Sequence, residues 1–338
     1  MIVNTRAQQA TRRYGQGMLA AYTPAPNPDD PLAALQVGDR PEPTVPDGWT
    51  TVSVRTAALN HHDLWSLRGV GLSAQRCPMI LGCDAAGLDE DGNEVIVHSV
   101  ISDPGWTGDE TLDPKRTLLS ELHQGTFAER VAVPRRNVLP KPADLSFTEA
   151  ACLGTAWLTA YRMLFTKSNT RPGDTVLVQG ASGGVATALI ALARAAGLRV
   201  WVTGRTEDKR RAALAGGAHE VFEPGARLPS RVDAVLETVG AATWSHSLKS
   251  LRPGGTLVVS GATTGPNPPA DLNRVFFLQL NVVGSTMGTR DELTRLVSML
   301  ETTGVRPVVD SELPLDQARV GFERMAAGEL TGKIVFTV

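Results

Sequence analysis

The chain has 338 residues and a formal net charge of −2, with 33 Lys and Arg against 35 Asp and Glu. This length allows two domains and a sizeable core, and the balanced charge gives no electrostatic attraction to nucleic acid or acidic membranes. The three cysteines, Cys77, Cys83 and Cys152, are too few for a disulfide scaffold and fit a reducing compartment.

Residues 1–17 are polar and carry three arginines and no acid. They lack the apolar core of a signal peptide, and no apolar run in the chain reaches the ~18 residues of a membrane span. We therefore expect a cytoplasmic protein whose folded part begins at Met18, after a disordered extension. A mitochondrial-type presequence is the alternative for residues 1–17.

The region 18–140 has a mainly β pattern. Alternating or apolar runs predict strands at 19–22, 50–59, 78–87, 94–99 and 125–133, and a short helix opens at Asn60. Residues 102–124 are long, polar and irregular, which indicates an insertion or a lid.

From residue 141 the pattern changes to alternating strands and helices. Strands are predicted at 175–179, 198–203, 219–222, 232–237, 256–260 and 281–286. The predicted helices are 148–166, 185–196, 207–215 and 272–280, with another around Trp244 and Leu248. This alternation predicts an α/β doubly wound parallel sheet over 141–289. The tail, 290–338, predicts helix, strand, helix and a final strand, and we expect it to rejoin the first domain.

A glycine-rich turn stands between the predicted strand 175–179 and helix 185–196. Gly180, Ser182, Gly183, Gly184 and Val185 form it, and a strand, a turn and a helix N-terminus together are typical of a dinucleotide pyrophosphate site. Against the pattern G-x-G-x-x-G, Ala stands at position 181 and at the permitted last position, 186. The alternative is a tight turn that binds nothing.

The tip of the next strand indicates which dinucleotide binds. NAD enzymes carry an acid there for the ribose 2′-OH, but this chain has Gly204, Arg205 and Thr206. Arg205 and Lys209 can pair with a 2′-phosphate, which favours NADPH. The alternative is that these are solvated charges at a helix start.

Five motifs together resemble the medium-chain dehydrogenase/reductase superfamily over about residues 18–338. They are ALNHHDLW (58–65), GCDAAG (82–87), GTFAE (125–129), GASGGV (180–185) and GSTMG (284–288). The resemblance implies a GroES-like catalytic domain (18–140 and 290–338), a Rossmann cofactor domain (141–289) and an active site between them. It places the nicotinamide near Thr159, Thr238, Val239, Gly261 and Ala262. Lys333 either closes the cleft or, as the alternative, is a surface lysine.

The resemblance also bears on zinc. Matched motif by motif, the catalytic zinc ligands of relatives fall on Asn60, Cys83 and about Thr155, of which only Cys83 is a good ligand. No cysteine stands between Cys83 and Cys152, so a structural zinc lobe is not expected either. An improvised site from His61, His62, Cys83 and Asp84 is the alternative; we expect no metal.

A zinc-free member of this superfamily resembles the quinone oxidoreductase branch, which implies an electrophilic acceptor such as a quinone or an α,β-unsaturated carbonyl. The motif 60–65 then supplies the catalytic candidates, Asn60, His61, His62, Asp63 and Trp65. By motif, the Asn60 amide binds the acceptor oxygen, and water, His61 or His62 donates the proton. Trp65 stands where that branch often has a tyrosine, and it cannot donate a proton in that way.

Two other functions stay open from the sequence: a zinc-dependent alcohol dehydrogenase and a non-catalytic NADPH-binding protein. We expect a small-molecule acceptor, no nucleic acid or membrane partner, and a homodimer. The dimer is expected through the sixth strand of the parallel sheet, because it is short, uncharged and at the edge.

Overall fold

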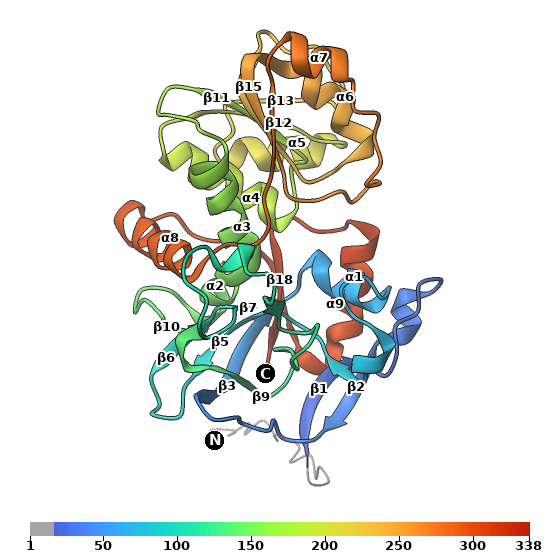
Figure 1. The fold of residues 1–338 in the computed structure, drawn as a ribbon, viewed down its shortest axis with the longest axis vertical. Coiled ribbons are helices and arrows are strands. Elements are labelled where there is room, and N and C mark those ends of the chain that lie inside the picture. Colours follow the sequence, from blue (N-terminus) through green and yellow to red (C-terminus); the bar gives the residue numbers. More distant parts are fainter. Residues whose placement is uncertain (1–16) are drawn as a thin grey trace, which may run out of the picture.

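The computed structural model describes residues 17–338. The chain forms two lobes, one above the other, with α8 (Arg290–Thr303) beside their junction (Figure 1). The expected extension, apart from Gly17, lies outside the described residues. Within those residues, no helix has both the length and the apolar character needed to cross a membrane.

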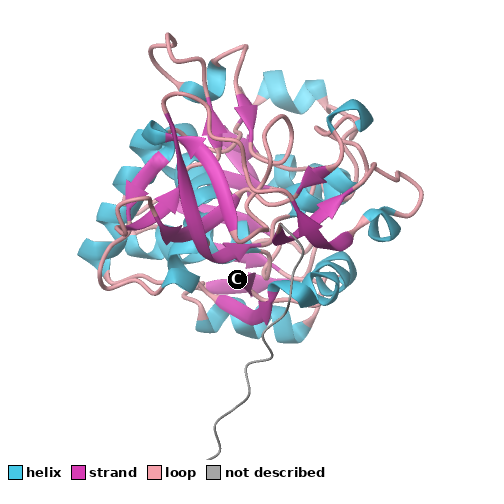
Figure 2. Cartoon of the chain, turned by 90° about the horizontal axis from the view of Figure 1, so that it is seen from below, coloured by secondary structure: helices cyan, strands magenta, loops and turns pink. Residues whose placement is uncertain are grey.

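The lower lobe is built on a seven-stranded sheet in the order β10-β6-β5-β3-β18-β17, with β9 also pairing with β3. Figure 2, the view from below, shows that strands dominate this lobe and that helices surround them. A three-stranded sheet β2-β1-β4 and a hairpin β7-β8 complete it. The strands are β1 (Met18–Thr23), β2 (Gln36–Arg40), β3 (Trp49–Ala58), β4 (Met79–Ile80), β5 (Asp84–Leu88), β6 (Glu94–Val97), β7 (Val100–Ile101), β8 (Thr117–Leu118), β9 (Arg130–Pro134), β10 (Val138–Pro140), β17 (Val309–Pro314) and β18 (Lys333–Thr337).

The tail closes this lobe. Strand β18 pairs antiparallel with β3, with Val335 opposite Ala58, and β17 pairs with β18. Helix α9 (Ala318–Ala327) brings Phe322 against Phe336 and Phe127, and all three rings are fully buried. This aromatic cluster joins the tail to the first part of the chain, since burying such side chains contributes about 1.5–3 kcal/mol each.

The upper lobe is a six-stranded, wholly parallel sheet in the order β13-β12-β11-β14-β15-β16. The predicted doubly wound α/β fold is therefore confirmed, and its strand order reverses between β11 and β14, where such sheets bind ligands. Its strands are β11 (Thr175–Gln179), β12 (Arg199–Thr203), β13 (Glu220–Phe222), β14 (Val232–Glu237), β15 (Leu251–Val259) and β16 (Asn281–Gly284). The helices around it are α4 (Gly184–Ala195), α5 (Glu207–Ala215), α6 (Ala241–Ser250) and α7 (Leu272–Phe277).

The segment predicted as one helix at 148–166 is not regular. It runs through α2 (Phe147–Ala151), a π-helical turn η5 (Leu153–Trp157), α3 (Leu158–Tyr161) and a second π-helical turn η6 (Arg162–Lys167). π-helical turns are rare and often occur at functional sites. Here they bring Thr155 and Arg162 into buried positions between the lobes.

Two predicted strands of the lower lobe are also interrupted. The run 78–87 divides into β4 and β5 around Gly82, whose φ is 97°. Of the run 125–133, only 130–133 lies in a strand, β9; before it, Gly125 and Phe127 donate to the carbonyls of Ile80 and Leu81. The remaining helices are α1 (His61–Leu67) and the short 3₁₀ turns η1 (Pro31–Ala34), η2 (Ala74–Arg76), η3 (Glu110–Leu112), η4 (Arg135–Asn137) and η7 (Leu315–Gln317).

Candidate active site

The glycine-rich turn lies between the carboxyl end of β11 and the start of α4. Gly180 has φ 89°, a backbone conformation that glycine adopts readily and other residues rarely adopt. Its N–H donates to Thr203 Oγ1 at 3.3 Å. Gly183 caps the helix, and a Cβ there would meet no atom within 4 Å. The turn therefore leaves open space beside Gly183 at the helix N-terminus, where free N–H groups favour a phosphate.

The tail contacts this turn directly. Gly332 N–H donates to Ser182 O at 2.8 Å, and a Cβ on Gly184 would lie 2.7 Å from Lys333 Cδ. Since that spacing is too short for any side chain, glycine at 184 is what allows the Lys333 stem to pass beneath the helix. Val185 follows in the first turn of α4.

A basic cluster follows the end of β12. Arg205 is exposed, and Lys209 Nζ donates to Gly328 O at 2.8 Å. Partial burial and the nearby Arg205 guanidinium lower the pKa of Lys209. Of the two acids in the first turn of α5, Asp208 pairs with Arg211 and Glu207 is exposed, and Gly204 O accepts from Arg210 Nη1 at 2.8 Å. The strand tip therefore presents positive charge.

Glu237, at the carboxyl end of β14, is a residue that the sequence analysis missed. Its buried carboxylate accepts from Val239 N–H (2.7 Å) and Gly240 N–H (3.1 Å), and from the hydroxyls of Thr243 (2.8 Å) and Ser247 (2.6 Å). These bonds hold the turn 238–240 in place. A charged residue at the buried carboxyl end of the strand was the available signal.

Thr238 and Val239 lie beside the second predicted nicotinamide segment. A Cβ on Gly261 would be 3.0 Å from Thr238 O, so the ends of β14 and β15 are adjacent, and Ala262 follows. Thr159 is buried in α3. The structure thus brings four of these five residues together at the carboxyl edge of the sheet.

A buried polar cluster stands at the end of β3. Lys333 Nζ donates to Asn60 Oδ1 (2.5 Å) and Leu59 O (2.7 Å), and lies 3.5 Å from Asp84 Oδ2. Asn60 Nδ2 donates to Asp84 Oδ2 (2.8 Å) and Ala58 O (3.1 Å). In this arrangement both amide N–H groups of Asn60 are already engaged, so neither is free for an acceptor.

We name Lys333, Asn60 and Asp84 together the Lys333 cluster. Asp84 is its acid. Burial raises the pKa of Asp84, whereas the Lys333 ammonium, Thr155 and Asn60 lower it. Asp84 Oδ1 and the Thr155 hydroxyl are buried and have no hydrogen-bond partner among residues 17–338. Buried polar atoms without partners are uncommon and mark a place for a ligand or water.

The two adjacent histidines have different surroundings. His62 Nδ1 lies 3.2 Å from Cys83 Sγ, and its Nε2 lies 2.9 Å from Glu121 Oε1. Burial opposes the imidazolium, but Cys83, Asp63 and Glu121 together raise the pKa of His62 well above its usual value. Both ring nitrogens of His62 are therefore engaged.

His61 is exposed at the start of α1. Partial burial and the Lys333 ammonium lower its pKa, with Asp63 acting the other way. Asp63 itself is structural, because it accepts from the backbone N–H groups of Asn60 (2.8 Å) and Gly82 (3.1 Å). Trp65 lies outside the polar cluster, with the Arg68 guanidinium 5.0 Å from its ring.

The donors present do not fit a zinc ion. In the described part of the chain, the side-chain donors of His62, Asp63 and Cys83 come within 4.8 Å of one another. The Cys83 thiol donates to Leu119 O at 3.3 Å, and burial raises its pKa, whereas zinc binds the thiolate. Asn60 stands at one of the ligand positions of zinc enzymes and already binds the Lys333 ammonium. The positive charge of this ammonium repels a zinc ion.

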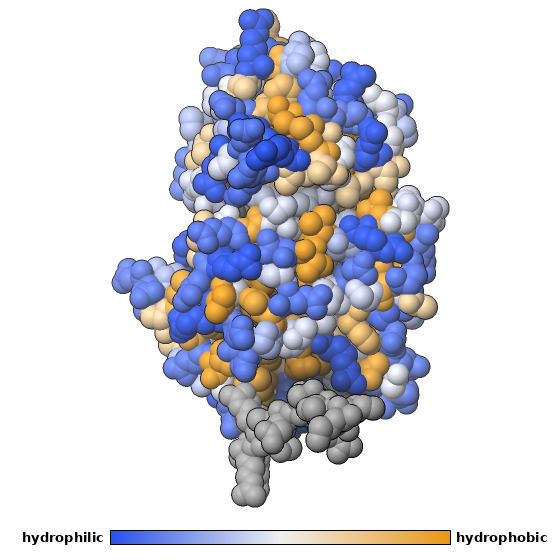
Figure 3. All heavy atoms as spheres, turned by 180° about the vertical axis from the view of Figure 1, so that it is seen from behind, coloured by the Kyte–Doolittle hydropathy of each residue, from blue (hydrophilic) through white to orange (hydrophobic). Residues whose placement is uncertain are grey.

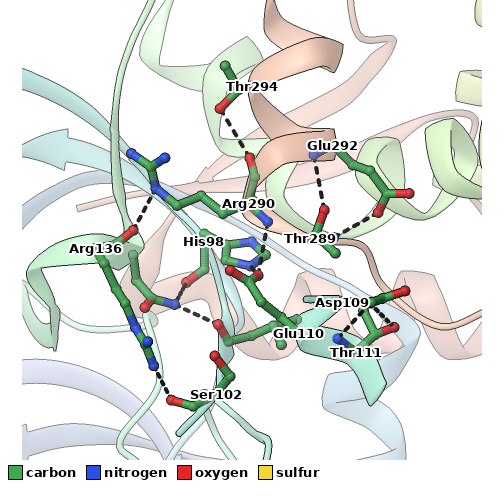
Figure 4. A network of polar contacts seen from close by, with 12 residues as sticks. His98, Ser102, Asp109, Glu110, Thr111, Arg136, Thr289, Arg290, Glu292 and Thr294 are labelled. Atoms are coloured by element: carbon green, nitrogen blue, oxygen red, sulfur yellow. Dashed lines mark hydrogen bonds and ion pairs between the residues drawn. The ribbon is translucent and has the colours of Figure 1, made fainter. Parts of the chain in front are cut away.

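The insertion 102–124 is held at both ends. Glu110 Oε2 accepts from His98 Nε2 (3.0 Å) and from the backbone N–H of Arg290 (2.9 Å), as Figure 4 shows. Arg290 also donates to Arg136 O at 2.7 Å. At the other end, Glu121 holds His62. The insertion therefore joins α8 to the site and orients one of its histidines.

Two family models match the chain. Residues 46–143 match the alcohol dehydrogenase GroES-like domain, and residues 184–302 match the zinc-binding dehydrogenase domain. The second description names zinc, which the donor set above does not fit.

Characterised relatives cover most of the chain. A quinone oxidoreductase of Rattus norvegicus is 32% identical over 80% of this chain and 83% of its own length. An acryloyl-coenzyme A reductase of Metallosphaera sedula is 28% identical over 89% and 96%. Among solved structures, an NAD-dependent alcohol dehydrogenase is 33% identical, with a TM-score of 0.88 over 95% of this chain and all of the other.

Proposed function

Because the chain belongs to the quinone oxidoreductase-like branch of the medium-chain dehydrogenase/reductase superfamily, we propose that it transfers hydride from NADPH to a quinone or an α,β-unsaturated carbonyl without catalytic zinc. The observation that carries this proposal is the Lys333 cluster. It sets a buried ammonium where zinc enzymes of the superfamily would set the metal.

The chemistry follows from this charge. The bound nicotinamide supplies the hydride. Hydride addition to an enone or quinone leaves negative charge on the acceptor oxygen. The N–H groups of Lys333 already meet Asn60 Oδ1, Leu59 O and Asp84 Oδ2, so we assign its buried ammonium to stabilise that charge through its field and not through a hydrogen bond. A Lewis acid is what helps an alcohol to lose its proton in the zinc enzymes, so a site without one suits activated acceptors better. Of the two histidines, His61 is the one with free ring nitrogens, and we assign it the proton transfer.

NADPH is proposed over NADH because Arg205 and Lys209 stand together at the end of β12. Both side chains reach Gly328: Lys209 Nζ donates to its carbonyl, and a Cβ there would lie 3.4 Å from Arg205 Nη2. Asp208 on α5 is paired with Arg211. A 2′-phosphate would relieve the repulsion between the two cations.

The direct test is NADPH oxidation over a panel of quinones and enones, with NADH and simple alcohols run in parallel. We expect turnover with enones or quinones and none with alcohols. Binding of NADPH without turnover of any acceptor would favour the non-catalytic alternative, and alcohol oxidation that depends on metal would favour the zinc enzyme.

Zinc should be dispensable. We expect purified protein to hold zinc well below one equivalent by elemental analysis, and a chelator to leave the NADPH-oxidation rate unchanged. The physical reason is the ammonium at Asn60 and Asp84, which repels a divalent cation. Stoichiometric zinc bound through Cys83 and a histidine would contradict this prediction.

The chain is also proposed to form a homodimer through β16. This strand is at the sheet edge, and its own Val282 exposes 46% of its surface. In the preceding helix α7, Leu272, Phe276 and Phe277 expose 69%, 67% and 79%. Apolar surface of this kind marks an interface, and two copies of an edge strand can pair about a twofold axis. Figure 3 shows apolar residues among hydrophilic ones on the upper lobe, seen from behind.

Val283→Lys should shift the protein from dimer to monomer at micromolar concentration, since it places a charge in the paired strand. Light scattering measures the mass. Leu214→Lys is the matched control, because Leu214 is an exposed apolar residue of the same lobe, on α5, and should leave the dimer intact. A parent protein that is already monomeric at this concentration would rule out the interface.

A further inference from the structure

Three buried polar side chains form a row across the parallel sheet. Gln179 of β11 is paired with Thr203 of β12. On the other side of β11, Val178 is paired with Leu236 of β14, and Glu237 follows Leu236. Each of the three polar residues is the last of its strand and is at most 1% exposed. Paired residues of neighbouring strands point to the same face of a sheet, so the three side chains stand side by side at its carboxyl edge.

Each residue of this row directly precedes one of the segments assigned to the cofactor. The three segments that follow are the glycine-rich turn (180–184), the basic strand tip (204–209) and the predicted nicotinamide turn (238–240). They correspond to the pyrophosphate, the 2′-phosphate and the nicotinamide of a dinucleotide, which binds along this edge of a doubly wound sheet. The row is thus next to all three parts of the cofactor site.

Continuous hydrogen bonds join the row. Gly180 N–H donates to Thr203 Oγ1 (3.3 Å), whose hydroxyl donates to Gln179 Oε1 (2.6 Å). Gln179 Nε2 donates to Ser247 Oγ on α6 (3.0 Å), and the Ser247 hydroxyl donates to Glu237 Oε2 (2.6 Å). We name Thr203, Gln179, Ser247 and Glu237 together the Gln179 chain.

The Gln179 chain ends on the backbone of the predicted nicotinamide turn, because Glu237 Oε1 accepts from Val239 N–H and Gly240 N–H. The amide of Gln179 is used completely, since Nε2 also lies 3.0 Å from His246 Nδ1. A buried network in which every member has a partner holds one geometry, whereas apolar side chains of similar volume specify a geometry less uniquely. The chain therefore ties the two turns to each other and not only to the sheet.

We propose that the Gln179 chain positions the cofactor: it fixes the nicotinamide turn relative to the glycine-rich turn and so sets the distance over which hydride is transferred. This inference rests on the proposed function and adds positioning residues to it. A rigid edge favours binding of the whole cofactor, because less conformational freedom is lost when the cofactor binds. It also favours the reaction, because a displacement of about 1 Å at the reacting centre can lower the rate about 100-fold.

Ser247→Ala breaks the chain at its centre. Each turn keeps its own contacts, because Gln179 still accepts from Thr203 and Glu237 still accepts from the turn N–H groups. NADPH binding should weaken about tenfold, the effect of losing a hydrogen bond to a charged group, and hydride transfer in a single turnover should slow at least about tenfold. Binding of 2′-phospho-ADP-ribose, which lacks the nicotinamide, should change by less than about twofold, since it does not span the two turns.

Ser250→Ala is the matched control. Ser250 is a buried serine of the same helix, and its hydroxyl donates to His246 O at 2.8 Å, outside the chain. Both ligands should bind this variant as they bind the parent, and hydride transfer should keep its rate. Thermal unfolding of each variant is measured beside these constants.

Glu237→Gln separates position from charge. The amide keeps an oxygen for the turn N–H groups and an N–H for Ser247, whose hydroxyl can accept as well as donate. Hydride transfer should therefore stay within about threefold of the parent rate, the range of one neutral hydrogen bond. A loss as large as that of Ser247→Ala would assign the effect to the carboxylate charge and overturn the inference.

Calorimetry with the two ligands needs no turnover and so separates this inference from the proposed function. If no acceptor is reduced but Ser247→Ala weakens NADPH binding alone, the proposed function fails and the positioning of the cofactor by the chain stands. An equal loss for NADPH and 2′-phospho-ADP-ribose would make Ser247 a structural residue of the whole edge. That result, no loss for NADPH, or an equal loss in Ser250→Ala would overturn the inference.

Discussion

Lys333→Met should lower kcat/KM for enones or quinones by about 100-fold or more, the usual loss when one preorganised oxyanion stabiliser is removed. Methionine preserves the apolar stem that passes beneath Gly184 and removes the ammonium. The same change should cost about 3–5 kcal/mol in the free energy of unfolding, because it leaves Asp84 as an uncompensated buried charge. Initial rates and chemical denaturation measure the two effects.

The double variant Lys333→Met/Asp84→Asn distinguishes catalysis from folding. Its neutral amide replaces the orphaned carboxylate, so stability should return toward that of the parent while the rate stays low. A double variant that recovers the full rate would show that the ammonium serves only the fold. In that case the zinc-free mechanism proposed here loses its source of charge stabilisation.

Arg205→Ala should weaken NADPH binding about 10- to 100-fold, since a charge-assisted contact to a phosphate is worth about 1.5–3 kcal/mol. NADH binding should change little, because the contact is with the 2′-phosphate alone. Fluorescence titration of both cofactors into the parent and the variant measures the ratio.

Arg199→Ala is the matched control for Arg205. Arg199 is an exposed basic residue at the start of β12, the opposite end of the strand from Arg205, so its removal should leave both affinities unchanged. Equal affinities of the parent for NADPH and NADH, or an equal loss for both in Arg205→Ala, would exclude the 2′-phosphate assignment.

The regular elements of the upper lobe were predictable because their signals are local. The strands 232–237 and 175–179 and the helix 207–215 have the predicted bounds in the structure, and helix α4 differs by one residue at each end. Apolar runs, the glycine turn and the cap at Thr206 act within a few residues of one another. The irregular helix at 147–167 was not predictable, since its π-helical turns have no local periodicity that marks them.

The histidine pair shows why the roles of the site residues were harder to predict from the sequence than the fold. His61 and His62 are equivalent by motif, but successive residues of a helix point about 100° apart. One therefore meets Cys83 and Glu121, and the other meets the solvent. Glu121 is 59 residues from His62 in the chain, and nothing in the sequence of the insertion 102–124 indicated this contact.

The sequence by itself determined the doubly wound sheet, the glycine-rich turn and the basic strand tip, because each depends on neighbours along the chain. Only the tertiary structure decided the charge of the active site. Lys333 and Asn60 are 273 residues apart, and Asp84 comes from a third segment. These residues come into contact because β18 pairs with β3. Electrostatic interactions depend on distance in space and on burial, and a sequence motif specifies neither.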